Sequence, residues 1–480
     1  MSSIKKNLGL QTLYQILSAC MPLITAPYLA RKLGAAQLGV FSYTTSIVAY
    51  FTLVAMLGTV NYGTRSIAGV KDNAEKRNQT FTSIYIFQLL VTVFSSIAYV
   101  VYLLFFCKDN KTIAIIQGIS LISCLFDINW LFFGVEDFQI TVTRSIVIKI
   151  ATVALILLLV KQENDLWIYT LIMLGGTLLS NMILFIYLPR HATIVRVQQI
   201  CEHIKPNVVL FIPLLAMTVY HTMDKTMLGL ISSYEQSGFY YNSDKIVQIP
   251  LLVINGIGTV MLPRMSSLLA NGKQREADEL FVTTLEGVAA VSIAIACGIA
   301  AVSMEFIPFF FGPGYEECIE VTIVFSPILL IKGFTTIART QYLIPMKMEK
   351  EFTKSVVGGA IVNLFLNAIL IRPYGALGAA AATVAAEIVA CLIQFYSLRG
   401  RGLGIDNTLK KTVIYLAIGL IMILLVRVIA LISIRNSVKL VIEIVIGILF
   451  YGSACLLYWM KTKNQFYEIL VKPILQRFKQ

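Results

Sequence analysis

Long runs of hydrophobic residues, separated by short polar segments, extend along almost the whole chain. A helix that crosses the hydrocarbon core of a bilayer needs about 20 mostly apolar residues, and the chain contains about fourteen runs of that length. The predicted spans are residues 8–30, 38–62, 80–106, 112–134, 140–160, 166–188, 207–231, 238–262, 280–304, 318–344, 352–371, 375–398, 412–434 and 438–460. The pattern therefore predicts an all-α integral membrane protein with about 14 transmembrane helices.

The composition strengthens this interpretation. Hydrophobic residues make up 57% of the 480 residues, charged residues make up 14%, and the mean hydropathy is +0.78. Soluble domains contain about 45–50% apolar and about 25% charged residues. The low charge content, together with the lack of a long polar segment, excludes a large soluble domain.

The net charge of +13 would raise the question of nucleic-acid binding in a soluble protein. Here most of the 39 lysines and arginines fall on one side when the predicted spans are threaded through a membrane. Basic residues concentrate in cytoplasmic loops, so this distribution places both the N- and the C-terminus in the cytoplasm. The excess charge also favours contact with anionic membrane lipids, and we expect no nucleic-acid partner.

A faint internal repeat relates the two halves of the chain. At an offset of 199 residues, Gly39–Tyr43 aligns with Gly238–Asn242, and Arg65 aligns with Arg264. Parallel repeats of this kind pack about an axis along the membrane normal, with a central path between them. The predicted organisation is an N-terminal six-helix lobe (1–189), a cytoplasmic basic linker (190–206), a second six-helix lobe (207–400), and helices 13 and 14 with a cytoplasmic tail (401–480).

The motifs of common enzymes do not occur in the sequence. The chain has no GxxxxGK[ST] phosphate-binding loop, no HExxH zinc motif and no GxSxG nucleophile motif. Its three histidines, His191, His203 and His221, are too dispersed for a metal site. We therefore expect a transporter rather than an enzyme, with no catalytic residue, no bound metal and no cofactor.

Charged residues inside the predicted spans are the candidate functional residues. Each costs about 2.5–3.5 kcal/mol at the centre of a span, so it normally faces a partner or a water-filled cavity. The basic candidates for a cationic cavity are Arg31, Arg144, Lys149, Lys225, Lys245, Lys332 and Arg339. Such a cavity would suit an anionic substrate such as a diphosphate, although each side chain could instead pack structurally or reach toward the headgroups.

Two neighbouring spans, 207–231 and 238–262, form a hairpin in which charges are predicted at matching depths. Lys225 and Lys245 both lie about 9–10 Å below the outer boundary of the bilayer. Asp224 and Asp244 share these depths, and a pair such as Asp224–Lys245 is geometrically possible. One interpretation is structural ion pairing. The other is a cationic patch on the central path, with carboxylates that bind Na⁺ or a proton.

The fourth predicted span contains the block Asp127-Ile128-Asn129-Trp130, followed by Gly134-Val135-Glu136-Asp137-Phe138 and then by Arg144. This block resembles the signature of the polysaccharide-transporter (Wzx-type) flippases, which belong to the superfamily of multidrug, oligosaccharidyl-lipid and polysaccharide exporters. Pro27–Gly34 with Gly39 and Arg65, the pair Asp224-Lys225, and Tyr374–Ala380 also resemble motifs of this family. The likeness extends from about residue 8 to residue 460.

The resemblance implies a flippase that moves undecaprenyl-diphosphate-linked oligosaccharides from the inner to the outer leaflet of a bacterial plasma membrane by alternating access. The product would supply capsule or O-antigen biosynthesis, and Na⁺, H⁺ or the membrane potential would supply the energy. A polysaccharide polymerase and a chain-length regulator are further candidate partners. The resemblance adds Arg65 to the cationic candidates and marks Asp127, Glu136 and Asp224 as family-type positions. Together with Asp244 of the hairpin, these three residues are the candidates for ion coupling or structural pairing.

Two other functions are compatible with the sequence. A cation-coupled multidrug exporter of the same superfamily would be expected to have a more acidic cavity than this one. A non-transporting membrane subunit of a polymer-assembly complex would have little need of so many charges inside its spans. Flipping of a peptidoglycan precursor is a variant of the flippase function that the resemblance implies.

Overall fold

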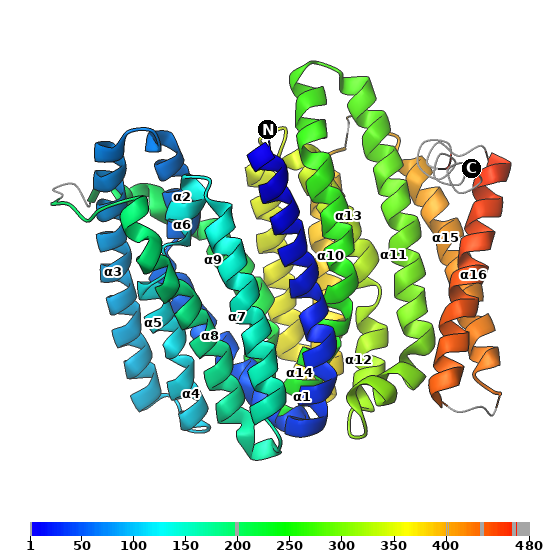
Figure 1. The fold of residues 1–480 in the computed structure, drawn as a ribbon. Coiled ribbons are helices and arrows are strands. Elements are labelled where there is room, and N and C mark those ends of the chain that lie inside the picture. Colours follow the sequence, from blue (N-terminus) through cyan, green and yellow to red (C-terminus); the bar gives the residue numbers. More distant parts are fainter. Residues whose placement is uncertain are drawn as a thin grey trace. The chain divides into compact units, whose positions relative to one another are not determined.

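The computed structural model describes residues 2–196, 201–399, 401, 403–432, 436–462 and 467. Throughout these residues the regular structure is helical (Figure 1). The chain divides into two compact units, a first unit of Met1–Gly238 and a second unit of Phe239–Gln480. The predicted lobe boundaries at 189, 206 and 400 stay predictions, and the part of the predicted tail after residue 467 lies outside the described residues.

The first unit contains nine α-helices and the beginning of a tenth among its described residues. They are α1 (Ser2–Met56), α2 (Thr59–Val70), α3 (Ala74–Phe105), α4 (Lys111–Gln117), α5 (Ile119–Leu125), α6 (Asn129–Gly134), α7 (Phe138–Leu159), α8 (Leu166–Tyr187), α9 (Ile204–Ile231) and the start of α10 (Tyr234–Ala270). Three single-turn 3₁₀ segments join them: Glu163–Asp165, Leu188–Arg190 and Cys201–His203. Helix α1 packs against α3, α7 and α9, and α7 packs against α8.

The second unit continues from α10 into longer helices. They are α11 (Gln274–Phe311), α12 (Glu317–Phe325), α13 (Ile328–Ala338), a π-helical segment η4 (Arg339–Leu343), α14 (Glu349–Ser397), α15 (Ile405–Ile429) and α16 (Asn436–Thr462). Helix α11 packs against α13, α15 and α16, and α15 and α16 pack against each other. The antiparallel pair α15–α16 is drawn in orange and red in Figure 1.

Two long helices are interrupted at glycine. Gly34 in α1 has φ 77° and Gly375 in α14 has φ 53°, a region that side chains with a Cβ rarely adopt. Gly34 lies between the predicted spans 8–30 and 38–62, and Gly375 is the first residue of the predicted span 375–398, which follows the span 352–371. The described residues contain 11 helices long and apolar enough to cross a membrane, and the count of fourteen stays a prediction.

The surface of α3 confirms the predicted lipid-facing character. Leu90, Phe94, Ile97 and Leu104 recur at helical spacing and are 60–69% exposed, whereas Gln88, Thr92 and Ser95 on another face are buried. A helix in water would show the opposite distribution. The multi-pass membrane assignment therefore rests on how the side chains are placed as well as on the hydropathy of the chain.

Helices α2 and α6 cross closely, because two glycines lie at their contact. A Cβ on Gly63 would lie 2.6 Å from the ring of Trp130, and a Cβ on Gly134 would lie 2.6 Å from Cβ of Ile67. Trp130 is fully buried in a cluster that also contains Ile67 and Phe81. The close approach explains the glycine at position 134 of the fourth-span block.

Replacing Gly63 with alanine is expected to destabilise the protein by about 1–3 kcal/mol, because the new methyl group would overlap the Trp130 ring. Gly69 in the same helix is the matched control, since a Cβ there meets no atom within 4 Å. Gly69→Ala should be neutral or stabilising by up to about 1 kcal/mol, because alanine is the better helix former. Unfolding midpoints of the two purified variants test the difference, and equal effects would contradict it.

Helices α15 and α16 are attached to α11 through a buried carboxylate near one end of the pair. Oε2 of Glu286 lies 2.7 Å from Nζ of Lys411, and its Oε1 accepts a hydrogen bond from the Tyr415 hydroxyl at 2.7 Å. Nε1 of Trp459 donates to that hydroxyl at 2.8 Å. Side chains of all three helices therefore meet at Glu286, which is only 3% exposed.

A second carboxylate of α11 makes the equivalent attachment near the other end of the pair. Oε2 of Glu305 lies 2.8 Å from Nη1 of Arg427 on α15, and its Oε1 lies 3.6 Å from Nζ of Lys439 on α16. Arg427 also donates to the carbonyl of Ala301 at 3.1 Å. Glu286 and Arg427, which are charges inside the predicted spans 280–304 and 412–434, thus have structural partners.

Candidate functional site

The predicted fourth span, 112–134, is not one continuous helix. It consists of α4, α5 and α6, and the helix is interrupted at residues 126–128, between α5 and α6. Asp127 lies in this break, where its Oδ1 accepts hydrogen bonds from the backbone N of Asn129 at 3.1 Å and from its side-chain Nδ2 at 2.7 Å. The carboxylate thereby caps the first turn of α6, a position that the helix dipole favours.

Gln88 of α3 supplies hydrogen bonds to backbone that the break leaves without helical partners. Its Nε2 donates to the carbonyl of Cys124 at 2.7 Å and to that of Asp127 at 3.0 Å. Its Oε1 accepts a hydrogen bond from Nε1 of Trp130 at 2.9 Å. Non-helical backbone is tolerated at membrane depth only where such partners exist, so Gln88 and Trp130 stabilise the interruption.

Arg144 of α7 connects the break to α8. Its Nη2 donates to Oδ1 of Asn129 at 3.0 Å, and its Nη1 donates to the carbonyl of Ser180. Asn129 in turn donates to Oδ1 of Asn181 at 3.2 Å, and Asn181 donates to Oγ of Ser123 at 3.0 Å. Four helices, α5 to α8, are therefore joined through one polar network, which we call the fourth-span network.

A pocket of 540 Å³ lies beside this network and is lined by residues of α7, α8 and the segment that follows α8. Two arginines, Arg144 and Arg190, are among its lining residues, together with Thr143, Tyr187 and Asp137. The guanidinium carbon of Arg190 lies 5.1 Å from the centre of the Tyr187 ring. Paired guanidinium groups suit the bidentate recognition of phosphate.

Two carboxylates make contacts at the segment that joins α6 to α7, one with a lysine and one with a histidine. Oε1 of Glu136 lies 3.0 Å from Nζ of Lys71, and this hydrogen bond raises the pKa of the Lys71 ammonium. Oδ2 of Asp137 lies 3.1 Å from Nε2 of His191. Glu136 has φ 63°, an uncommon conformation for a residue other than glycine. The structure thus gives Glu136 a pairing role, as the sequence allowed.

The other cationic candidates of the first unit lie apart from this pocket. Arg31 on α1 and Arg65 on α2 are exposed. Lys149 on α7 donates to Oγ of Ser18 at 2.6 Å. Lys225 on α9 is half-buried and follows Asp224, which is 2% exposed.

The second unit contains the remaining candidates. Nζ of Lys245 lies 3.9 Å from the centre of the Tyr241 ring, and Asp244 accepts a hydrogen bond from Gln248 at 3.0 Å. Lys332 lies 3.2 Å from Oε1 of Glu387, and the guanidinium carbon of Arg339 lies 5.7 Å from the centre of the Phe352 ring. Five of the eight cations belong to the first unit and three to the second, so the single cavity that they were predicted to line stays a prediction, as does an Asp224–Lys245 pair.

Exchanging the two charges of the Lys332–Glu387 pair is expected to separate its structural role from a role in substrate binding. The single variant Lys332→Glu should be destabilised, because it places two carboxylates together at a site where both side chains are under 20% exposed. The double variant Lys332→Glu/Glu387→Lys should regain most of that stability but little transport, because the cation has moved from α13 to α14.

The exposed pair Lys273–Glu276, at 2.8 Å, is the control for this exchange, and its reversal should change neither stability nor transport measurably. Full transport by the exchanged Lys332–Glu387 pair would remove Lys332 from the substrate-binding candidates. Thermal midpoints measure the stability of the variants, and transport assays on the same preparations measure their activity.

Several residues at the break and in the fourth-span network were not among the predicted site residues. Gln88, Asn129 and Asn181 are uncharged, and only charged residues within spans were considered as candidates. Amide side chains inside apolar helices are a usable signal, because they must also find hydrogen-bond partners in lipid. Arg190 was assigned to the linker, whereas its side chain lines the pocket with Arg144.

Solved structures of known transporters share this fold. The structure titled "Lipid II flippase MurJ, inward closed conformation" matches with a TM-score of 0.74 and 17% identity, covering 94% of this chain and 99% of that chain. An inward-facing multidrug resistance MATE family transporter matches with a TM-score of 0.58 and 12% identity, covering 82% and 99%. The fold is therefore that of a multi-pass helical membrane transporter.

Sequence comparison then identifies the family. The family described as "Polysaccharide biosynthesis protein" matches residues 4–269. The chain is 23% identical over 407 residues to a protein of Escherichia coli K12 named "Putative O-antigen transporter", covering 84% of this chain and 98% of that protein. A protein of the same name from Shigella dysenteriae is 25% identical and covers 82% and 100%.

The chain belongs to the polysaccharide biosynthesis protein family, and its resemblance to Wzx-type transporters is confirmed. Its relatives are transporters and flippases, which confirms the prediction of a transporter rather than an enzyme.

Proposed function

We propose that this protein flips undecaprenyl-diphosphate-linked oligosaccharides from the inner to the outer leaflet of a bacterial plasma membrane, for the synthesis of a surface polysaccharide. The observation that carries the proposal is the pocket of 540 Å³ beside the fourth-span network, which is lined by two arginines, Arg144 and Arg190. Each guanidinium can bind phosphate oxygens bidentately. A diphosphate is the charged group that a lipid-linked oligosaccharide must bring through the membrane.

The proposed role of Arg144 is to bind phosphate while anchored to the protein. Its contacts with Asn129 and with the Ser180 carbonyl hold the guanidinium plane in one orientation, which lowers the entropic cost of binding. The lipid tail would remain in the bilayer while the sugar and diphosphate cross by alternating access. Na⁺, H⁺ or the membrane potential would supply the energy.

The relatives support this substrate class. Two are named as O-antigen transporters, and a Bacillus subtilis protein named "Lipid II flippase MurJ" is 23% identical over 214 residues, covering 44% of this chain and 38% of that protein. Lipid-linked saccharides are common to these names. A multidrug exporter is supported by fold similarity alone.

Reconstitution tests the proposal directly. The purified full-length protein is incorporated into liposomes with a fluorescent undecaprenyl-diphosphate oligosaccharide, and exposure of the lipid is followed with a membrane-impermeant quencher. We expect protein-dependent exposure beyond the fraction that is initially accessible. The assay is run with and without an imposed Na⁺ gradient, H⁺ gradient or membrane potential, which identifies the energy source.

A fluorescent lipid with a monophosphate in place of the diphosphate is the matched control for the charged group. Equal transport of both lipids would contradict a role for two guanidinium groups. Failure to move several different diphosphate-linked glycans, together with transport of a cationic dye, would replace the proposal with multidrug export.

A further inference from the structure

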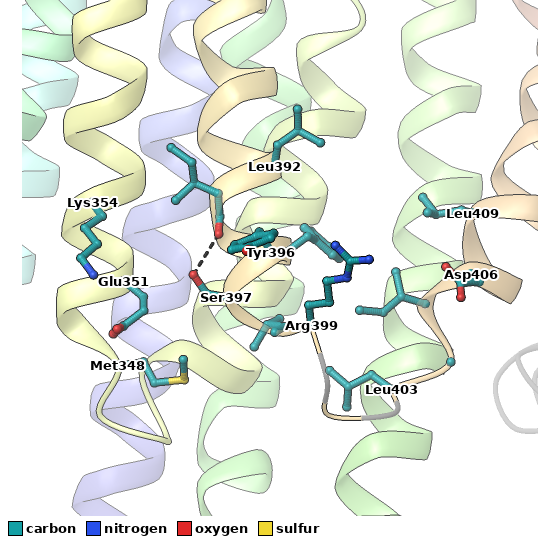
Figure 2. A pocket seen from close by; sticks show the side chains of 15 residues that line it. Met348, Glu351, Lys354, Leu392, Tyr396, Ser397, Arg399, Leu403, Asp406 and Leu409 are labelled. Carbon is teal, nitrogen blue, oxygen red and sulfur yellow. Dashed lines mark hydrogen bonds between the residues drawn. The ribbon is translucent and has the colours of Figure 1, made fainter.

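The second unit contains a larger cavity, of 1480 Å³, which the proposed function does not use. It is lined by both ends of α14 and by the beginning of α15 (Figure 2). Helix α14 ends at Ser397 and α15 begins at Ile405, so the cavity lies where membrane-spanning helices end. This is the level at which the hydrocarbon core of a bilayer meets its headgroups.

The lining residues at the end of α14 change in character along the helix. Leu392 and Tyr396 lie four residues apart on one face of α14, and Arg399 follows just beyond the end of the helix (Figure 2). Leu392 is 63% and Tyr396 is 72% exposed, and Arg399 is also exposed. An apolar, an aromatic and a cationic side chain therefore succeed one another over about 10 Å, in the order of the acyl chain, the ester region and the phosphate of a phospholipid.

Leu409 of α15 adds a second apolar side chain, 46% exposed, to the same lining. Large exposed apolar side chains at the end of a membrane helix are normally covered by lipid, and tyrosine is enriched at this level. The cavity can therefore be reached by a bilayer lipid without removing protein contacts.

The charged lining residues carry both signs. Lys354 and Glu351 lie one turn apart near the start of α14, and Arg399 and Asp406 lie near the α14–α15 connection (Figure 2). Within the described part of the chain, none of these four side chains forms a hydrogen bond or an ion pair. Two cations and two carboxylates thus line one cavity and remain available to a ligand.

This combination of charges selects one kind of lipid. A purely anionic headgroup would meet two carboxylates as well as the two cations. A headgroup with a phosphodiester and a primary ammonium can satisfy both signs, because the ammonium provides three N–H donors for carboxylate oxygens. A trimethylammonium group carries the same charge but provides no N–H donor.

We propose that this cavity is a binding site for phosphatidylethanolamine. The phosphodiester binds Arg399, the ammonium binds Asp406, and an acyl chain lies along Leu392, Tyr396 and Leu409. The lipid is a component of the surrounding membrane and not the transported substrate, so the proposal is independent of the function proposed above.

Native mass spectrometry of the full-length protein in detergent tests this assignment. The protein is titrated with phosphatidylethanolamine, phosphatidylcholine and phosphatidylglycerol that carry identical acyl chains. We expect phosphatidylethanolamine to bind roughly tenfold more tightly than phosphatidylcholine, because only the former donates charge-assisted hydrogen bonds to the carboxylate of Asp406. Equal affinities for these two lipids, or tightest binding of phosphatidylglycerol, would overturn the proposal.

Variants localise the effect to the cavity. Asp406→Asn should remove the preference for phosphatidylethanolamine over phosphatidylcholine, whereas Arg399→Glu should weaken the binding of both. Glu349→Gln is the matched control, because Glu349 is exposed in the first turn of α14 but does not line the cavity, and it should retain the tenfold preference. Retention of the preference by Asp406→Asn would also overturn the assignment. Thermal midpoints equal to that of the unaltered protein show that the variants are folded.

Discussion

Replacing Arg144 with glutamine is expected to lower the rate of oligosaccharide flipping by roughly a hundredfold. Hydrogen bonds to a charged group contribute about 1.5–3 kcal/mol, and each 1.4 kcal/mol corresponds to a factor of ten. Glutamine is too short to reach Asn129, the Ser180 carbonyl and the pocket at once. The loss should therefore combine weaker phosphate binding with a less ordered site.

Two further variants separate these contributions. Arg144→Lys keeps the charge but not the planar fork, so it should flip at a rate between those of the glutamine variant and the unaltered protein. Arg196→Gln removes one exposed arginine of the same unit that does not line the pocket, and it should leave the rate unchanged. The assay is the liposome measurement described above, with thermal midpoints to confirm folding. An unchanged flipping rate in Arg144→Gln would exclude Arg144 from the site.

Replacing Glu286 with alanine is expected to destabilise the second unit by about 3–5 kcal/mol, the usual cost of removing one partner of a buried ion pair. The change leaves Lys411, only 22% exposed, without its carboxylate, and it leaves the Tyr415 hydroxyl without its acceptor. The measurement is unfolding of the purified protein in mixed micelles of increasing denaturing-detergent content.

The double variant Glu286→Met/Lys411→Met should recover much of this loss, because replacing both charges with apolar groups removes the unpaired ion. Glu276→Ala on the same helix is the control, since its pair with Lys273 is exposed and should contribute at most about 1 kcal/mol. If Glu276→Ala destabilised the protein as much as Glu286→Ala, the burial of the Glu286–Lys411 pair would not be the cause of the lost stability.

The hydrophobic pattern was sufficient to predict the class of fold, because lipid imposes the same requirement on every span. The breaks at Gly34 and Gly375 were also predictable as span boundaries. The break at residues 126–128 was not, because Phe126, Asp127 and Ile128 include neither glycine nor proline. That interruption depends on hydrogen bonds from Gln88, which is 36 residues away from Cys124 in the sequence. A contact between residues so far apart cannot be predicted from a local sequence pattern.

The candidate site was predictable only in part, for a related reason. Charge inside a span indicated Arg144 and Asp127, and both belong to the fourth-span network. The same signal also selected Lys332, whose charge is paired with Glu387. Glu286 is likewise a charge inside a predicted span, and its partners are side chains of the protein. A charge in lipid requires a partner, but the sequence does not show whether that partner is a substrate or another side chain.

The two attachment points on α11 also have a consequence for the membrane itself. The interval from Glu286 to Glu305 corresponds to roughly 28 Å of helix, close to the ~30 Å hydrocarbon thickness of a typical bilayer. Because α15 and α16 are fixed to α11 near both ends, they cannot adjust their tilt independently when the bilayer becomes thicker or thinner. The second unit therefore has a fixed hydrophobic thickness on this side, and the lipids next to α15 and α16 must stretch or compress to match it.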